Sequence, residues 1–305
     1  MSAPTASAQG AVGRAAAVFD LSRGRQALLS VAQPALGALL ALGALPSVRV
    51  VALGLVAAGS GFLAVFSLND LLDRKVDIEA AESGPVGGDG YDLDTAYVRH
   101  PLARGDLSVR EASVWIGGLA AVSIVCAWLL APICLALFAG AVALEVFYCT
   151  LRRVTWAKTF VSGLMVGVGG LAGWVAVARL SWGAAAFFAF LALWEIGGRN
   201  LPNDLADLDA DGRTGIRTVA TTFGPAVSAT ATLAVTWATL ASVLLLPTSL
   251  LARLGAAVAA VAVMVVPALG LARQPTSERA GRYFNLASTL PVVVFFIVLV
   301  ATLAL

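Results

Sequence analysis

Two short acidic phrases with the same spacing interrupt an otherwise apolar chain. Both have the pattern N-D-x-x-D-x-x-x-D, and each follows a long apolar segment. The first acidic motif comprises Asn69, Asp70, Asp73 and Asp77. The second acidic motif comprises Asn203, Asp204, Asp207 and Asp211. Because residues i, i+3 and i+7 share one face of a helix, each motif can direct three carboxylates at one point.

Clusters of carboxylates are suited to binding a hard cation. Their oxygen atoms are the ligands that Mg²⁺ prefers, and Mg²⁺ in turn binds phosphate groups. A solvated loop is the simpler interpretation, since Asp and Asn are common loop residues, but a loop has no reason to repeat a helical face. The repeat therefore predicts one metal and diphosphate site, built from two halves of the protein, with the six motif aspartates as metal ligands.

Four arginines flank the acidic motifs and are candidates to bind the diphosphate. Arg99 and Arg104 follow the first motif, and Arg213 and Arg217 follow the second. Guanidinium groups bind phosphate oxygens in a bidentate way and can neutralise charge that metal ions leave uncompensated. The alternative is that these arginines only reflect the excess of basic residues in cytoplasmic loops.

Further polar residues occur near the inner ends of two apolar segments. Tyr148 and Arg152 are four residues apart, so they share a helix face and can bind a leaving phosphate together. An interfacial aromatic beside a snorkelling arginine is the alternative. Glu145 and Glu195 are functional candidates because carboxylates are costly within a membrane. Pairing of Glu195 with Arg199, and of Glu145 with a nearby arginine, is the simpler interpretation.

The elements that must position these residues are membrane helices. The chain has 305 residues, of which 59% are hydrophobic and 12% charged, whereas soluble domains average about 25% charged residues. Its mean hydropathy is +0.89. A membrane-spanning helix needs about 20 apolar residues, and we expect nine such helices in an all-α bundle. They cover 27–45, 49–68, 111–130, 132–150, 158–178, 182–199, 227–246, 251–272 and 283–305.

The distribution of Lys and Arg predicts the orientation of the bundle. With the N-terminus inside, only Arg49, Arg179 and Arg253 fall on the outer side. This places the two long loops, 69–110 and 200–226, on the cytoplasmic side of the cell membrane. Residues 1–26 lack the apolar core of a signal peptide, so we expect a cytoplasmic tail followed by a membrane domain over 27–305.

Several other classes of protein are disfavoured. A net charge of +2 gives no support for a nucleic-acid partner. The chain has no Walker A phrase and no CxxC, and its only histidine, His100, has no evident nucleophile partner. Its three cysteines lie in or at the ends of apolar segments without metal-ligand spacing.

Taken together, these motifs resemble those of the UbiA superfamily of intramembrane prenyltransferases, and the resemblance covers nearly the whole chain. Besides the two acidic motifs, residues 100–108 are similar to the family's R-P-L-x-x-G-x-x-S. Residues 211–218 are similar to its D-x-x-x-G-x-x-T, and Tyr148-x-x-x-Arg152 is similar to its Y-x-x-x-K.

The resemblance implies a helical bundle around a central lipid-accessible chamber, capped by cytoplasmic loops. It also implies that the motif aspartates and Asn69 hold Mg²⁺ and a prenyl diphosphate, with Asn203 at the corresponding position and Arg152 in place of the family's lysine. Two departures remain. His100 stands where the family usually has Arg, although Arg99 is adjacent, and residues 78–98 form a longer connector than usual.

The function expected from these observations is Mg²⁺-dependent transfer of a prenyl group to a hydrophobic acceptor, such as an aromatic acid or a quinone precursor. Phe62, Phe66 and Phe190 are candidates to line a tunnel for the isoprenoid tail. A terpene cyclase, or a lipid-forming transferase with a polar acceptor, is open as an alternative on the same scaffold. A transporter is disfavoured because the acids lie at the membrane edge, and a non-catalytic scaffold would not need them.

Overall fold

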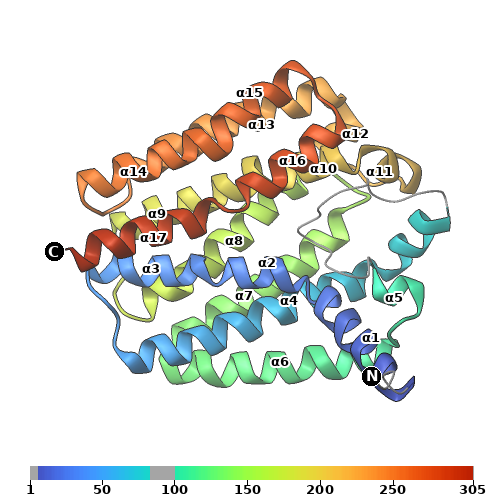
Figure 1. The fold of residues 1–305 in the computed structure, drawn as a ribbon, viewed down its shortest axis with the longest axis horizontal. Coiled ribbons are helices and arrows are strands. Elements are labelled where there is room, and N and C mark those ends of the chain that lie inside the picture. Colours follow the sequence, from blue (N-terminus) through green and yellow to red (C-terminus); the bar gives the residue numbers. More distant parts are fainter. Residues whose placement is uncertain (1–5, 83–99, 305) are drawn as a thin grey trace, which may run out of the picture.

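Every regular element of the described chain is a helix. The computed structural model describes residues 6–82 and 100–304, and most of its helices run along the longest axis of the molecule (Figure 1). This arrangement confirms the predicted all-α class.

Eight helical stretches of the described residues are long and apolar enough to cross a membrane. Four of them are single helices between loops: α4 (Val48–Glu82), α6 (Val109–Leu130), α7 (Pro132–Leu151) and α8 (Lys158–Val175). A fifth is α13 (Pro225–Val243). The others are interrupted and comprise α2 (Gly24–Ser30) with α3 (Ala32–Leu42), α14 (Leu250–Ala260) with η2 (Val261–Val265) and α15 (Val266–Arg273), and α16 (Ser277–Ala287) with α17 (Leu290–Leu303).

Of the nine predicted spans, the segment 182–199 has no counterpart among these eight stretches of the described residues. It corresponds to α9 (Trp182–Trp194) followed by a π-helix, η1 (Glu195–Asn200), and then α10 (Leu201–Ala206). The π-helix ends α9 after 13 residues, so neither piece alone reaches the length of a span. The number of nine spans and the inward N-terminus therefore stay predictions.

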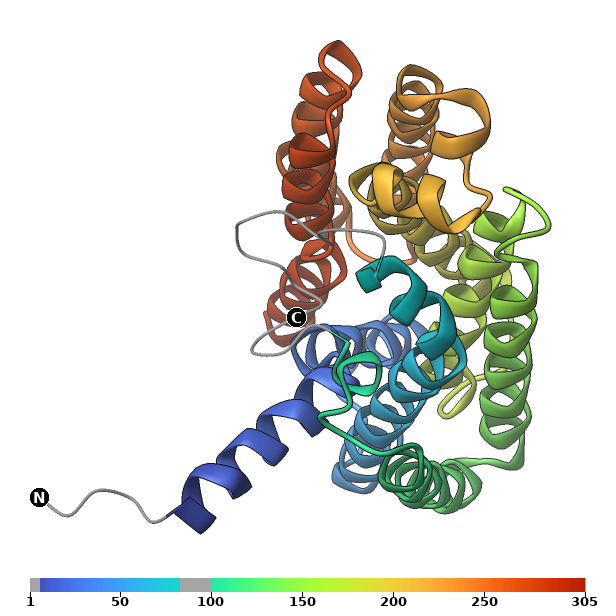
Figure 2. The same ribbon diagram turned by 90° about the vertical axis from the view of Figure 1, so that its right-hand side faces the viewer.

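Short helices gather at one end of the bundle, which we call the motif end. They are α1 (Ala6–Leu21), α5 (Pro101–Arg104), α10, α11 (Leu208–Thr214) and α12 (Val219–Phe223). They lie on the right in Figure 1, together with the C-terminal part of α4, whereas the end of α17 lies at the opposite end. Figure 2 views the molecule from the motif end.

Helix α4 continues beyond the point where the sequence predicts a loop. The apolar segment ends at residue 68, but the helix runs to Glu82 and carries the whole first motif. Residues 62–82 contain neither Gly nor Pro, and charged residues are compatible with a helix, so nothing stops it sooner. The first motif is therefore held on a rigid element.

Local signals set the helix boundaries that follow the motifs. Gly105 and Gly215 both have positive φ, which lets the chain turn at the ends of α5 and α11. Capping boxes at Ser108 and Thr218 then begin α6 and α12. These turns return the chain to the bundle after each motif.

The largest hydrophobic core lies among α3, α8, α9, α13 and the C-terminal helices. Trp174, Phe187 and Trp194 are almost completely buried in it. Phe190, a candidate for a tunnel wall, is also fully buried in this core. It therefore packs the bundle and is absent from the lining of the apolar cavity described below.

Candidate active site

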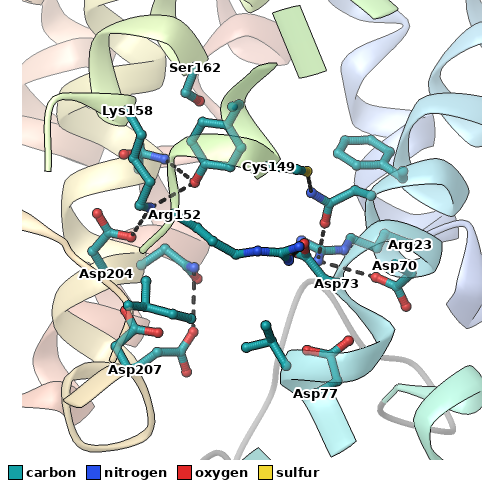
Figure 3. A pocket seen from close by; sticks show the side chains of 18 of the residues that line it. Arg23, Asp70, Asp73, Asp77, Cys149, Arg152, Lys158, Ser162, Asp204 and Asp207 are labelled. Atoms are coloured by element: carbon teal, nitrogen blue, oxygen red, sulfur yellow. Dashed lines mark hydrogen bonds and ion pairs between the residues drawn. The ribbon is translucent and has the colours of Figure 1, made fainter. Parts of the chain in front are cut away.

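Both acidic motifs line one pocket at the motif end. The pocket has a volume of about 240 Å³ and lies between α4 and the helices that carry the second motif (Figure 3). All six motif aspartates and both motif asparagines line it. The two halves of the chain thus present their carboxylates to a common space.

Each aspartate of the first motif contacts a basic side chain. The pairs are Asp70 with Arg23 at 3.3 Å, Asp73 with Arg152, and Asp77 with His100 at 3.1 Å between Oδ2 and Nδ1. Arg23 also donates to the side-chain oxygen of Asn69 at 3.0 Å. The guanidinium groups of Arg23 and Arg152 offset part of the negative charge of the motif.

Two of these basic residues have a strained backbone. Arg23 and His100 have φ of 42° and 50°, and they are the only non-glycine residues with positive φ in the described chain. Each precedes the first residue of a short helix, α2 or α5, and each side chain contacts the first motif. Such strain is uncommon for residues with a Cβ and is often retained at functional sites.

The second motif does not lie on one continuous helix. Helix α10 ends at Ala206, Asp207 has φ of −93° and ψ of 13°, and α11 begins at Leu208. The expectation that one helical face carries all three carboxylates is therefore correct only for the first motif. The bend at Asp207 nevertheless leaves Asp204, Asp207 and Asp211 in the lining of the pocket.

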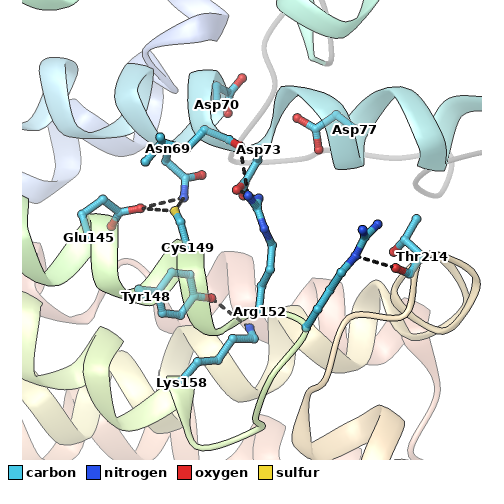
Figure 4. A network of polar contacts seen from close by, with 12 residues as sticks. Asn69, Asp70, Asp73, Asp77, Glu145, Tyr148, Cys149, Arg152, Lys158 and Thr214 are labelled. Atoms are coloured by element: carbon cyan, nitrogen blue, oxygen red, sulfur yellow. Dashed lines mark hydrogen bonds and ion pairs between the residues drawn. The ribbon is translucent and has the colours of Figure 1, made fainter.

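Lys158 connects the second motif to the middle of the bundle. Its Nζ lies 3.1 Å from Oδ1 of Asp204, and both side chains are more than nine-tenths buried. The same ammonium group donates to the Tyr148 hydroxyl at 3.0 Å, and Asn200 donates to that hydroxyl at 3.1 Å. Tyr148 therefore contacts the second half of the chain, whereas Arg152 reaches the first motif (Figure 4).

Asp211 lies in an unfavourable environment for a negative charge. Burial, together with the carboxylates of Asp204 and Asp207, raises the pKa of Asp211 to about 8. A cation bound among these groups would relieve their mutual repulsion.

Adjacent arginines at the end of α7 tie the two halves together. Arg152 contacts Asp73 and donates to the carbonyl of Leu72 at 3.0 Å. Arg153 contacts Glu79 on α4 and donates to the carbonyl of Thr214 on α11 at 3.1 Å. Arg153 thus connects α4 to α11, and Arg152 beside it reaches the first motif.

Two buried carboxylates lie deeper in the pocket. Glu195 pairs with Arg199 at 3.2 Å, as the sequence predicts, and accepts a hydrogen bond from Ser162 at 2.8 Å. Glu145 accepts a hydrogen bond from Asn69 at 2.7 Å instead of pairing with an arginine. Its partner is therefore a residue of the first motif.

Only some of the basic residues predicted to bind the diphosphate are found in the lining of the pocket. Arg152 lines the pocket, but Arg104, Arg213 and Arg217 are not among its lining residues. Arg104 pairs with Asp106 on the surface at 3.1 Å, and the backbone of Arg217 donates to the carbonyl of Arg152 at 2.7 Å. Arg99 lies outside the described residues. A diphosphate-binding role for these four arginines stays a prediction.

Two basic residues that line the pocket are not predicted as site residues from the sequence. They are Arg23 and Lys158. Arg23 lies in the stretch taken as a tail, and its position next to Gly24 gives no periodic signal. Lys158 does offer a signal, because it is a lone lysine at the inner end of an apolar segment.

The donor set of the pocket fits a divalent cation with a phosphate partner. Among the described residues, no three His, Cys, Asp or Glu side chains are arranged to hold a metal ion by themselves. Such a cage is not required for Mg²⁺, which uses one or two carboxylates together with waters and phosphate oxygens. Oδ2 of Asp204 is buried without a hydrogen-bond partner, so it is available as a ligand.

An apolar cavity of about 480 Å³ adjoins the pocket. The two spaces share four lining residues, Phe66, Glu145, Glu195 and Arg199. Of the proposed tunnel residues, Phe62 and Phe66 line the cavity. The site therefore combines a pocket lined by charged side chains with an apolar cavity beside it, which suits a ligand with a charged head and a hydrocarbon tail.

The described helices form a membrane bundle in which paired acidic motifs lie beside an apolar cavity, and this defines a class of membrane protein suited to a ligand with a charged head and an apolar tail. Residues 30–301 match the UbiA prenyltransferase family, so the chain belongs to that family. The suspected family is thereby confirmed, as is the assignment to a prenyltransferase, and the chain is a multi-pass membrane protein. No curated protein matches the chain.

Solved structures of related fold support the same architecture. A UbiA homolog from Aeropyrum pernix K1 has a TM-score of 0.70 and 20% identity, covering 90% of this chain and 97% of its own. A UbiA homolog from Archaeoglobus fulgidus bound to DMAPP and Mg²⁺ has a TM-score of 0.66 and 18% identity, covering 93% and 99%. A digeranylgeranylglyceryl phosphate synthase has a TM-score of 0.68 and 15% identity, covering 96% and 99%.

Proposed function

We propose that this protein transfers a prenyl group from a prenyl diphosphate to a hydrophobic acceptor with release of pyrophosphate. The observation that carries the proposal is that a pocket lined by both acidic motifs adjoins an apolar cavity, with four lining residues in common. The Archaeoglobus fulgidus relative bound to DMAPP and Mg²⁺ supports the proposal.

In this proposal the motif aspartates hold Mg²⁺, which neutralises the diphosphate and stabilises its departure. The six ligands are Asp70, Asp73, Asp77, Asp204, Asp207 and Asp211, and all line the pocket. Asn69 and Asn203 supply amide contacts beside them.

Basic side chains bind the diphosphate oxygens that the metal leaves free. Arg23, Arg152 and Lys158 are the basic groups that already face these carboxylates. On binding of the diphosphate, Arg152 exchanges its contact with Asp73 for a phosphate oxygen, and the Tyr148 hydroxyl lies close enough to Lys158 to assist it. These cations stabilise negative charge as it develops on the leaving group.

The chemical step breaks the bond between the allylic carbon and the diphosphate oxygen, and the electron pair leaves with the pyrophosphate. A nucleophilic carbon of the acceptor forms a bond to the allylic carbon and then loses a proton to a base. Carboxylates at the junction of the two spaces, Glu145 and Glu195, are near enough to the apolar cavity to stabilise positive charge there. The apolar walls exclude water that would otherwise quench the cation.

For the acceptor we propose an aromatic acid or a quinone precursor, because such a molecule partitions into the membrane and carries an electron-rich carbon. The test incubates the purified full chain with Mg²⁺, a series of prenyl diphosphates and a panel of aromatic acceptors. Pyrophosphate release and product mass are measured together. A prenylated acceptor is expected, whereas a cyclic product formed without acceptor would indicate a terpene cyclase.

The acidic motifs provide matched variants for this test. Asp70→Asn and Asp204→Asn are expected to abolish pyrophosphate release, since each removes a charge from the pocket. Asp209→Asn is the control, because Asp209 lies within the second motif but is exposed and does not line the pocket. Full release by the first two variants would refute the shared site.

A further inference from the structure

The apolar cavity is long, and its length bears on the substrate. Along α4 its lining runs from Phe66 at the junction to Val50 near the opposite end. A helix rises 1.5 Å per residue, so this wall is about 24 Å long. An isoprene unit has four chain bonds of about 1.5 Å and advances by about 5 Å when extended. The wall therefore matches about four to five units.

The far end of the cavity is lined by side chains that are also exposed on the surface of the described bundle. Leu45, Val51 and Leu55 line the cavity there, and all three are exposed on the surface of the bundle. A chain that fills the cavity can continue past these side chains into the surrounding hydrocarbon. The cavity wall therefore sets a preferred minimum length for the prenyl chain of the ligand and no maximum length.

Glycines keep the channel open at two depths. A Cβ built on Gly54 of α4 or on Gly169 of α8 would meet no atom within 4 Å, and both residues line the cavity. Gly169 lies seven residues beyond Ser162 of the pocket, or about 10 Å along α8. Gly54 lies twelve residues from Phe66, or about 18 Å along α4.

We propose that the donor is a long-chain prenyl diphosphate of four or more isoprene units, and that Gly169 and Gly54 keep the second and fourth unit positions of the channel open. The inference rests on the proposed function, because it assumes that the diphosphate binds at the acidic motifs. A ligand of two units leaves the outer half of the cavity unfilled, so it loses the contacts that a longer chain makes there.

The test measures binding, so it needs no acceptor. The purified full chain is titrated in one detergent with Mg²⁺ and prenyl diphosphates of ten, fifteen, twenty and forty carbons. The twenty- and forty-carbon ligands are expected to bind at least about tenfold more tightly than the ten-carbon ligand. Equal affinity for all lengths would overturn the length inference alone, whereas absence of Mg²⁺-dependent binding at every length would refute the proposed function itself.

Glycine variants test the channel directly. Gly54→Leu is expected to weaken binding of the twenty-carbon ligand at least about tenfold and to leave the affinity for the ten-carbon ligand unchanged. Gly169→Leu is expected to weaken binding of the ten-, fifteen- and twenty-carbon ligands alike, because it lies at the second unit position, which all three occupy. Gly59→Leu is the control, since Gly59 lies on α4 with no atom within 4 Å of its Cβ but outside the lining. Equal losses for the ten- and twenty-carbon ligands in Gly54→Leu, or the same losses in the control, would overturn the proposal.

Discussion

Lys158 makes the most deeply buried ion pair of the pocket, and its energetic role differs from that of an exposed charge. The ammonium and the carboxylate of Asp204 are both nearly inaccessible to solvent. Removing one partner of a buried pair leaves the other charged without compensation, whereas replacing both by neutral groups is often tolerated. Lys158 thus affects both the fold and the chemistry of the site.

Lys158→Met is therefore expected to lower the free energy of unfolding by about 3–5 kcal/mol. The double variant Lys158→Met with Asp204→Asn is expected to recover most of that loss while remaining inactive. Thermal unfolding of the purified protein in detergent measures the first effect, and pyrophosphate release measures the second. A single variant as stable as the unsubstituted protein would contradict this account.

The raised pKa of Asp211 predicts how the stability of the protein depends on pH. Its pKa is raised to about 8, chiefly by burial, so the unfolded chain ionises this carboxyl at lower pH than the folded chain does. In metal-free protein, stability attributable to Asp211 therefore falls as pH rises from about 4 to 8. We expect Asp211→Asn to raise the unfolding temperature near pH 8 and to leave it unchanged near pH 4.

Melting curves in the presence of a chelator measure this difference across the pH range. Addition of Mg²⁺ is expected to remove the advantage of Asp211→Asn, because a bound cation compensates the carboxylate. A temperature shift of the same size at both pH values would indicate a packing effect instead of a charge effect.

The sequence identifies the acidic side chains of the site more readily than the basic ones. Carboxylates are rare in an apolar chain, so the repeated spacing of the motifs is visible without any structure. Arg23 and Lys158 are single basic residues, and their proximity to Asp70 and Asp204 arises from packing between elements far apart in sequence. A contact of that kind leaves no local pattern.

At the scale of elements, the π-helix η1 determines where the second motif lies. All six of its residues are buried, and they connect α9 to α10 just before Asn203 and Asp204. A π-turn contains one residue more than an α-turn, so it rotates everything that follows relative to the helix before it. Hydrophobic periodicity cannot reveal such a shift within six residues, and the sequence accordingly predicts a simple span here.

Insertion of one alanine after Gly198 is expected to add a residue between α9 and α10 and so to turn α10 by about 100°. Asp204 would then leave the pocket and lose Lys158, so pyrophosphate release should fall to background. Gly198→Ala is the control, because it keeps the register and only crowds Met264 and Trp194, which lie 3.1 Å from the new Cβ. If the insertion variant is as active as the Ala variant, the helical register set by η1 has no role in placing the motif.

At the scale of the whole molecule, the two halves meet both in the apolar core and at the motif end. Composition and helix length suffice to predict a helical membrane bundle, because lipid requires every backbone hydrogen bond to be made within a helix. They do not predict that α1 packs beside the loop after the first motif, where Ala17 and Leu21 are buried with Leu102 and Leu107. That contact connects the segment predicted as a tail to the site. It depends on a few apolar side chains whose spacing in the sequence shows no periodic pattern.

The orientation of the bundle remains a prediction that the distribution of charge makes testable. Arg49 and Arg253 begin helices at the opposite end, whereas basic residues are concentrated at the motif end, which should therefore face the cytoplasm. A membrane-impermeant maleimide is expected to label Ser47→Cys in intact cells. Gln274→Cys, in the exposed turn between α15 and α16, should be labelled only after permeabilisation.

The unsubstituted protein is the control for this labelling, because its three cysteines lie within the membrane helices α6 and α7 and are at most partly exposed. The reverse pattern, with Gln274→Cys labelled from outside, would place both acidic motifs on the outer face. A site there would be separated from cytoplasmic prenyl diphosphates, so this outcome would also contradict the proposed supply of the donor. Orientation thus links the arrangement of basic residues to the chemistry of the pocket.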